Sequence, residues 1–347
     1  MSLTEPVVSR EQPKVFLVIL NRNGWEDTIA CLDSNYEGDY RWFEAVVVDN
    51  DSTDGSLQKI RDWARRKGAP IKADITLRGG EEGCCPIAPF SPSTLTLIET
   101  GKNLGYSGGN NRGFRYALQN GADLIFQLNN DVVVERNSLT RLVGSIQTDP
   151  RMAVVYPLIL GLEGENQVPA YLRPPFSLWE LLINSNLLGF FWSRLNYHEY
   201  LKQRNPYPGY QYDRLLPVPN VAGACCLYRR ELFEQIGLLD ESVFMYHEEA
   251  ILIQKLRKAH FIACLDPSTK VLHKGGRDNA KLPPAFLYTR RVCGEIYYAQ
   301  KYLGVSRLGQ WLLMSLRFME YSYHMLKSPE YRGRFSEFMR LYLLGRT

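Results

Sequence analysis

The chain has 347 residues, of which 45% are apolar and 22% charged, and it carries a formal net charge of +4. That length suits one large or two modest domains, and the composition excludes collagen, a disordered tail protein and a small disulfide scaffold. The small net charge argues against a nucleic-acid partner. The seven cysteines contain no CxxC spacing of the kind found in zinc ribbons or thioredoxin-like sites.

The N-terminal sequence MSLTEPVVSREQPK carries charges and prolines and has no apolar core typical of a signal peptide. No stretch reaches the roughly 18 uninterrupted apolar residues that a membrane-spanning helix needs. We therefore expect a cytoplasmic protein.

The first half of the chain alternates between strand and helix patterns. Continuous apolar runs predict strands buried on both faces at residues 15–20, 44–48, 95–99 and 123–128. Helical patterns follow these strands at residues 25–32 and 53–67, in a third segment that ends at about residue 120, and at residues 138–148. Residues 68–93 are expected to be irregular. Strands separated by helices of this length predict an open, largely parallel α/β sheet.

The second half begins with an aromatic and proline-rich stretch at residues 165–215. It predicts an insertion that covers or shapes a site, with an irregular loop as the alternative. Beyond it we expect regular structure at 218–228, helices at 229–236 and 247–259, and short strands at 261–265 and 270–272. The last sixty or so residues have mainly helical patterns.

Polar side chains cluster where three of the four predicted strands end. These residues are Asn21, Asp49, Asn50, Asn129 and Asp131. Asn and Asp are common turn residues, which is the simpler explanation of any one cluster. The carboxyl ends of parallel strands meet at one edge of a sheet, however, so three clusters there favour a ligand site. Asp131 could hold a hard divalent cation that bridges phosphates.

The segment NLGYSGGNNRG, from Asn103 to residue 113, is expected to be a loop that leads into a helix. Its glycines, which include Gly108 and Gly109, allow close backbone approach, and its N–H groups suit a diphosphate. The segment is not the GxGxxG fingerprint, and none follows the first strand. A nicotinamide-dependent oxidoreductase is therefore the less favoured alternative.

Two further features carry titratable side chains. Glu248 and Glu249 are adjacent at a predicted helix start, and His273 follows a predicted strand and precedes a glycine turn. Each also has a structural explanation, because acids favour the first turn of a helix and a lone histidine is more often structural than a ligand.

In chain order, the segments VILNRNG, VVDNDSTDGS, KNLGYSGGNNRG, LNND, FMYHEE and HKGG resemble the inverting nucleotide-sugar glycosyltransferases of family 2. The match covers about residues 14–276 and is most like bacterial rhamnosyltransferases and related cell-envelope sugar transferases. The resemblance implies a GT-A fold, a Rossmann-like open mixed sheet flanked by helices, here followed by a helical C-terminal extension.

The resemblance also implies roles for individual residues. Glu249 would be the general base with Glu248 beside it, and Asp131 and His273 would hold Mg²⁺ or Mn²⁺. The donor nucleotide would be bound by Asn21, Asp49, Asn50, Asn103, Gly108, Gly109, Asn111 and Asn129.

The implied function is metal-dependent, inverting transfer of a sugar from a dTDP- or UDP-sugar, with dTDP-rhamnose as one candidate donor. The implied acceptor is a hydroxyl of a glycan or lipid-linked acceptor in cell-envelope polysaccharide synthesis. Two departures stand out: the metal motif keeps only its last carboxylate, and Ile251 occupies the place of a later acid. The second departure motivates the alternative of a catalytically impaired sugar-nucleotide-binding protein.

Residues 281–347 hold eleven Lys and Arg against four Asp and Glu, a local charge of +7. Apolar residues from Leu308 to Leu326 recur at helical spacing with Arg307 and Arg317 nearby, which predicts a basic amphipathic helix. Such a helix could lie on an anionic membrane, placing the protein peripherally on the inner face of the cell membrane. The alternatives are packing on the catalytic core and a homodimer contact.

Overall fold

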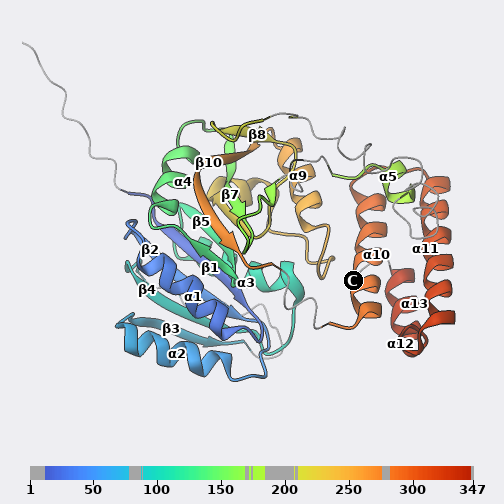
Figure 1. Cartoon of the computed structure of the whole chain (residues 1–347), viewed down its shortest axis with the longest axis horizontal. Helices are drawn as coiled ribbons and strands as arrows, with labels where there is room; N and C mark the ends of the chain where they lie inside the picture. Colours follow the sequence, from blue (N-terminus) through green and yellow to red (C-terminus); the bar gives the residue numbers. More distant parts are fainter. Residues whose placement is uncertain are drawn as a thin grey trace, which may run out of the picture.

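The computed structural model describes residues 12–77, 87, 89–168, 172, 175–183, 207, 210–275 and 282–344. Within these residues the strands form one ten-stranded sheet, and a group of C-terminal helices stands beside it (Figure 1). The sheet order is β3-β4-β2-β1-β5-β9-β7-β10-β6, and β8 pairs with β10. This is the predicted open mixed sheet with a helical C-terminal region.

The first part of the sheet is parallel, as predicted. Its strands, in sheet order, are β3 (Ile71–Thr76), β4 (Thr94–Glu99), β2 (Phe43–Asp49), β1 (Val15–Asn21) and β5 (Leu124–Asn129). The register pairs Asn21 with Asp49 and Asp49 with Glu99, so these strands end at one edge. The expectation that residues 68–93 are wholly irregular is wrong, because β3 forms a half-exposed edge strand there.

The second part of the sheet is mixed. Its strands are β9 (Cys225–Arg229), β7 (Met152–Leu160), β10 (Ile262–His273), β6 (Val132–Val134) and β8 (Leu216–Val218). Strands β7 and β10 pair in parallel and run in the same direction as β5, whereas β9, β6 and β8 run the opposite way. Strand β9 runs antiparallel to both β5 and β7, and β10 pairs antiparallel with β6. The two short strands predicted at 261–265 and 270–272 are one strand with an irregularity between Asp266 and Lys270. Strand β7 was not predicted.

Several helices lie between strands of the sheet in the sequence. They include α1 (Trp25–Tyr36), α2 (Ser56–Lys67), α3 (Gly105–Gln119), α4 (Ser138–Ile146), α8 (Arg230–Ile236) and α9 (Glu248–Lys258). Helix α3 packs against β1 and β2. It begins inside the segment expected to be a loop, because its glycines let it approach the sheet closely. A Cβ on Gly109 would lie 2.4 Å from Leu20 Cδ1.

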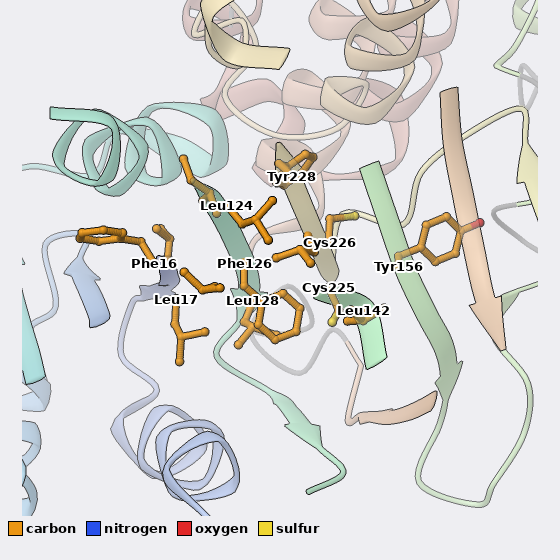
Figure 2. Packing of buried hydrophobic residues seen from close by; sticks show 14 of the residues in the cluster. Phe16, Leu17, Leu124, Phe126, Leu128, Leu142, Tyr156, Cys225, Cys226 and Tyr228 are labelled. Carbon is orange, nitrogen blue, oxygen red and sulfur yellow. The ribbon is translucent and has the colours of Figure 1, made fainter. Parts of the chain in front are cut away.

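The main core lies between the central strands and the helices that cover them. Figure 2 shows buried side chains that come from β1, β5, β9 and β7, among them Phe126, Tyr156 and Tyr228. Fully burying one such side chain contributes about 1.5–3 kcal/mol. Cys225 and Cys226 are free and fully buried here, and burial raises the pKa of the Cys226 thiol to about 12, so both act as small apolar side chains.

A second apolar cluster joins the C-terminal helices to the rest of the molecule. It is formed by α5 (Leu178–Ile183), α10 (Pro284–Lys301), α11 (Arg307–Lys327), α12 (Pro329–Gly333) and α13 (Phe335–Leu344). Val243 and Ile251, from α9 and the segment before it, are buried in the same cluster. The inner face of these helices is thus packed against the part of the chain that carries Glu248 and Glu249.

A buried ion network ties the same helices together. The guanidinium of Arg317 donates to Glu295 of α10 at 2.5 Å, to Glu320 at 2.8 Å and to the Leu181 carbonyl oxygen at 2.7 Å. All three charged side chains are essentially unexposed. Arg317 therefore lies on the inner face of α11, and so does Tyr321.

The outer face of α11 is apolar and exposed. Leu308, Trp311 and Leu326 are 67%, 65% and 82% exposed, and Met319 and Tyr323 lie between them along the helix. In the described part of the chain, no helix combines the length and the apolar character needed to cross a bilayer.

Candidate active site

A cleft of about 830 Å³ opens at the carboxyl edge of the parallel strands. Most of its lining comes from the strand ends, from residues 244–249 before and at the start of α9, and from five residues in and beside the C-terminal helices. Asp27, Tyr106 and Gly223 also line it. Seven of the residues predicted for the site are in its lining, namely Asn50, Asn103, Asn129, Asp131, Glu248, Glu249 and His273.

Asn50 and Asn103 bring the end of β2 and the start of α3 together in the cleft wall. The Asn50 side-chain amide donates to Asn103 Oδ1 and to the Gly105 carbonyl oxygen, both at 3.0 Å. The Leu104 N–H donates back to Asn50 Oδ1 at 2.9 Å. These bonds hold both amides in fixed orientations at the cleft.

Asn21 and Asp49 lie just behind that wall and are not among its lining residues. Asn21 donates to Asp49 Oδ1 at 2.6 Å and accepts from the Thr28 hydroxyl at 2.8 Å. Asp49 also accepts from the Ser52 hydroxyl at 2.6 Å. Both side chains are buried and serve the turn after β2, which places the neighbouring Asn50.

Gly108, Gly109 and Asn111 lie within α3, contrary to the loop expected there, and none of them lines the cleft. The two glycines face close neighbours in Leu104 and Leu20 rather than open space. Asn111 donates to the carbonyl oxygen of residue 239 at 2.9 Å and accepts its N–H at 3.1 Å, so its amide fixes the segment that leads to Phe244.

Sheet register brings Asp131 and His273 together. Asp131 lies in the tight turn between β5 and β6, and His273 pairs with Val132 of β6 at the end of β10. His273 Nε2 is 3.5 Å from Asp131 Oδ1. Gln167 Oε1 accepts from His273 Nδ1 at 2.9 Å, so in the neutral ring Nε2 carries the lone pair and faces the carboxylate.

This donor set fits a divalent cation held jointly with a ligand. A carboxylate and an imidazole nitrogen are suitable protein donors, and the outer bond from Gln167 orients the imidazole. Among the described residues no group of three or more His, Cys, Asp or Glu could hold a metal. Phosphate oxygens and water would therefore complete the coordination, as is usual for Mg²⁺ beside nucleotides.

Glu248 and Glu249 start α9 after two strained residues. Tyr246 and His247 have φ of +68° and +66°, in the left-handed region that non-glycine residues rarely adopt. This conformation turns the chain sharply, and both glutamates line the cleft at the first turn of the helix. Such strain is maintained only where the surrounding structure enforces it. Here His247 stacks on Tyr298 of α10 with ring centroids 5.9 Å apart.

Burial raises the pKa of both glutamates. Glu248 experiences in addition the negative charge of Glu249, and its Oε2 has no hydrogen-bond partner within the described chain. Burial dominates at Glu249 as well, opposed by the backbone N–H groups of Glu249 and Gly223, which stabilise its ionised form. A carboxylate with a raised pKa is a stronger base, which suits proton abstraction near neutral pH.

A polar network that was not predicted fixes Gly223 against Glu249. The carbonyl oxygen of Gly223 accepts from Gln127 at 2.7 Å and from the Tyr106 hydroxyl at 2.5 Å. The hydroxyl of Tyr228 donates to the other end of Gln127 at 3.1 Å. The signal in the sequence for this network is Gln127, a single polar residue within the apolar run LIFQL.

Ile251 lies away from the cleft. Its side chain is 1% exposed and belongs to the C-terminal apolar cluster. The position at which the resemblance expects a later acid is therefore part of the apolar packing in this chain and not part of the cleft lining.

The far wall of the cleft comes from residues for which no role was predicted. Leu282, Pro283, Phe286, Arg290 and Arg334 line it from the C-terminal helices. No local pattern distinguishes them from the other basic and aromatic residues of that region.

Comparisons with known proteins agree with this geometry. The model of the family "Glycosyl transferase family 2" matches residues 86–237. The N-acetylglucosaminyl-diphospho-decaprenol L-rhamnosyltransferase of Mycobacterium tuberculosis is 27% identical over 253 residues, which are 68% of this chain and 76% of that protein. The low-salt glycan biosynthesis hexosyltransferase Agl10 of Haloferax volcanii is 31% identical over 243 residues, 70% of this chain and 61% of that protein.

Among solved structures, the mannosyltransferase PcManGT from Pyrobaculum calidifontis, in complex with GDP-Man and Mn²⁺, matches with a TM-score of 0.50. The match has 17% sequence identity and covers 96% of this chain and 81% of that one. At this identity the likeness concerns the fold alone.

Proposed function

Because the chain belongs to glycosyltransferase family 2, we propose that it moves a sugar from a nucleoside-diphosphate sugar to an acceptor hydroxyl with inversion at the anomeric carbon. The observation that carries this proposal is that Asp131 and Glu249 line one cleft although more than a hundred residues separate them in the sequence. A donor bound through its diphosphate at Asp131 would then have its sugar within the same space as the glutamate.

In this proposal Glu249 accepts the proton of the acceptor hydroxyl as that oxygen bonds to the anomeric carbon. The bond from the anomeric carbon to the diphosphate oxygen breaks, and its electron pair leaves with the nucleoside diphosphate. Asp131 and His273 would hold Mg²⁺ or Mn²⁺, which supplies counter-charge for that leaving group. Attack and departure occur on opposite faces of the sugar, so the configuration inverts.

The remaining residues would position the reactants. Asn50, Asn103 and Asn129 present amides at the strand ends, where they can bond the nucleotide, while Asn21 and Asp49 support them from behind. Gly108, Gly109 and Asn111 would act through the placement of α3 rather than by touching the donor.

We propose a dTDP- or UDP-sugar as donor, with dTDP-rhamnose as the first candidate, and a glycan or lipid-linked acceptor of cell-envelope polysaccharide synthesis. Support comes from the rhamnosyltransferase relative, whose name specifies N-acetylglucosaminyl-diphospho-decaprenol. The cleft's strand-end amides and its arginine-bearing far wall are compatible with both substrates.

The test has two stages. Thermal shift with Mn²⁺ and a panel of nucleoside diphosphates and nucleotide sugars identifies the donor, and nucleotide release with candidate acceptors then measures turnover. We expect Glu249→Gln to keep nucleotide binding and to lose turnover by a factor of at least ~100, the lower end of what general-base catalysis contributes. Turnover at the wild-type rate in Glu249→Gln would remove the proposed base.

We also propose that the outer face of α11 lies on the inner, anionic face of the cell membrane. This face combines exposed Leu308, Trp311 and Leu326 with exposed Arg307 and Lys327, so it offers apolar burial and charge complementarity together. A lipid-linked acceptor would be embedded in the same membrane.

Vesicle flotation of the full-length protein tests the membrane proposal. We expect binding to vesicles that contain phosphatidylglycerol, weaker binding to phosphatidylcholine alone, and loss of both in a Trp311→Ser, Leu326→Ser double variant. Leu162→Ser, at an exposed leucine remote from α11, is the control. If the double variant instead converts a dimer into a monomer without altering flotation, the face is a homodimer contact and the membrane proposal fails.

A further inference from the structure

Two arginines on the far wall of the cleft form a preorganised pair. The Arg290 guanidinium lies over the rings of Phe244 and Phe286, at 4.8 and 4.9 Å from their centroids, and Arg334 lies 5.7 Å from the Phe286 ring. Stacking of this kind fixes the plane of a guanidinium and limits the freedom it would lose on binding a ligand.

The pair is only partly neutralised. Glu337 accepts from Arg290 at 3.1 Å with one oxygen and from Arg334 at 2.8 Å with the other, so two positive charges share one carboxylate. In addition, Arg290 Nε is buried and has no hydrogen-bond partner in the described part of the chain. An unsatisfied, charged donor in a cleft wall is costly unless a ligand completes it.

The ligand that fits is a diphosphate or a similar dianion. Guanidinium groups bind phosphate oxygens through paired N–H donors, and two arginines side by side match adjacent phosphoryl groups. Carboxylates are a poorer match, because Glu337 already supplies one and still leaves an excess positive charge.

The donor diphosphate has a separate place in the proposed mechanism, at Asp131 and His273 on the strand-end side. Arg290 and Arg334 belong instead to the C-terminal wall, beside apolar Leu282 and Phe286. We propose that this wall is an acceptor subsite, in which Arg290 and Arg334 bind the diphosphate of a prenyl-diphosphate-linked acceptor. This inference rests on the proposed function and deepens it by naming the acceptor class.

Farnesyl diphosphate is a suitable probe, because it carries the diphosphate and a short prenyl chain and dissolves in water. Its binding to the full-length protein is measured by calorimetry in EDTA, so that no divalent metal can recruit it to Asp131. UDP and dTDP binding is measured in parallel with Mn²⁺. Farnesol, which has the chain without the diphosphate, is the chemical control.

We expect Arg290→Gln and Arg334→Gln each to weaken farnesyl diphosphate binding on the order of tenfold, since each removes charge-assisted hydrogen bonds. UDP and dTDP binding should change by less than about twofold. Farnesol lacks the diphosphate, so the wild-type protein should bind it no more tightly than the arginine variants do. Arg66→Gln, which removes an exposed helical arginine of α2 to which no role is assigned, is the control and should leave all affinities unchanged.

Glu337→Gln separates this inference from a purely structural role. Removing the shared carboxylate frees both guanidinium groups, so farnesyl diphosphate should bind more tightly, whereas the loss of a merely structural ion pair would weaken binding or leave it unchanged. The inference is overturned if Glu337→Gln fails to tighten binding, or if the arginine variants lose UDP and farnesyl diphosphate equally. Failure of the proposed function is read separately, as absence of UDP and dTDP binding by the wild-type protein with Mn²⁺.

Discussion

The contact between Gly223 and Glu249 gives the sharpest test of the proposed base. A Cβ added at Gly223 would lie 2.5 Å from Glu249 Oε1 and 3.2 Å from its Cδ. Carbon and oxygen atoms in weak contact are normally about 3.3 Å apart or more. In Gly223→Ala the carboxylate must therefore move by roughly 0.8 Å, because Gly223 is held by Gln127 and Tyr106.

A displacement of about 1 Å at a reacting group costs on the order of a hundredfold in rate, or about 2.7 kcal/mol in activation free energy. We expect Gly223→Ala to lower kcat by 10- to 100-fold while nucleotide affinity stays within about twofold, because the strand-end amides are untouched. Gly144→Ala is the control: no atom lies within 4 Å of its added Cβ, so the rate should not change.

The assay is nucleotide release at saturating donor and acceptor, with melting temperature measured on the same preparations. A shorter carboxylate offers a further check, since Glu249→Asp in the Gly223→Ala background relieves the clash and should cost less than the sum of the two single changes. A Gly223→Ala variant with wild-type kcat would refute the assignment of Glu249 in its observed position.

Three other predictions follow from the same structure. Gln167→Leu removes the hydrogen bond that orients the His273 ring. The Mn²⁺ concentration for half-maximal activity should therefore rise at least ~10-fold, while kcat at saturating Mn²⁺ is unchanged. An unchanged Mn²⁺ titration would contradict this prediction. Burial raises the pKa of Glu248 in the folded state. Between the unfolded and folded pKa values the folded state holds an extra proton, so stability falls as pH rises. Glu248→Gln should therefore raise the melting temperature more at pH 8 than at pH 5, and equal gains at the two pH values would contradict this prediction. Arg317→Ala removes the positive charge that faces the buried carboxylates of Glu295 and Glu320 and should cost about 3–5 kcal/mol in urea unfolding. A value under about 1 kcal/mol would be the contrary result.

The parallel half of the sheet could be predicted because its strands are continuous apolar runs that end in turn residues. Two of the missed strands lack that signature: β3 is half-exposed at the sheet edge, and β6 has three residues. Strand β7 was missed although it is a continuous apolar run. The start of α3 was expected too late in the chain, because it contains glycine and asparagine that disfavour helices in isolation. Tertiary packing reverses the last preference, since close approach of α3 to β1 requires those glycines.

Some residues of the candidate site could be predicted from the sequence, and others could not. Asn50, Asn103 and Asp131 lie within four residues after the ends of their strands, so their common edge could be expected from the order of elements. The approach of Gln167 to His273 depends on contacts between residues more than a hundred positions apart. Nothing local in the C-terminal sequence indicates that Arg290 turns inward while Arg307 remains in solvent, because both occur in helices of mixed basic and aromatic composition.

Helix α9 presents its first turn to the cleft and buries Ile251 among the C-terminal helices. Those helices therefore cannot be exchanged with a relative's as an interchangeable module. A graft that altered the side chains around Ile251 would tilt α9 and move the glutamates with it. Redesign of acceptor preference in this protein has to proceed by single substitutions on the cleft side, with the inner packing left intact.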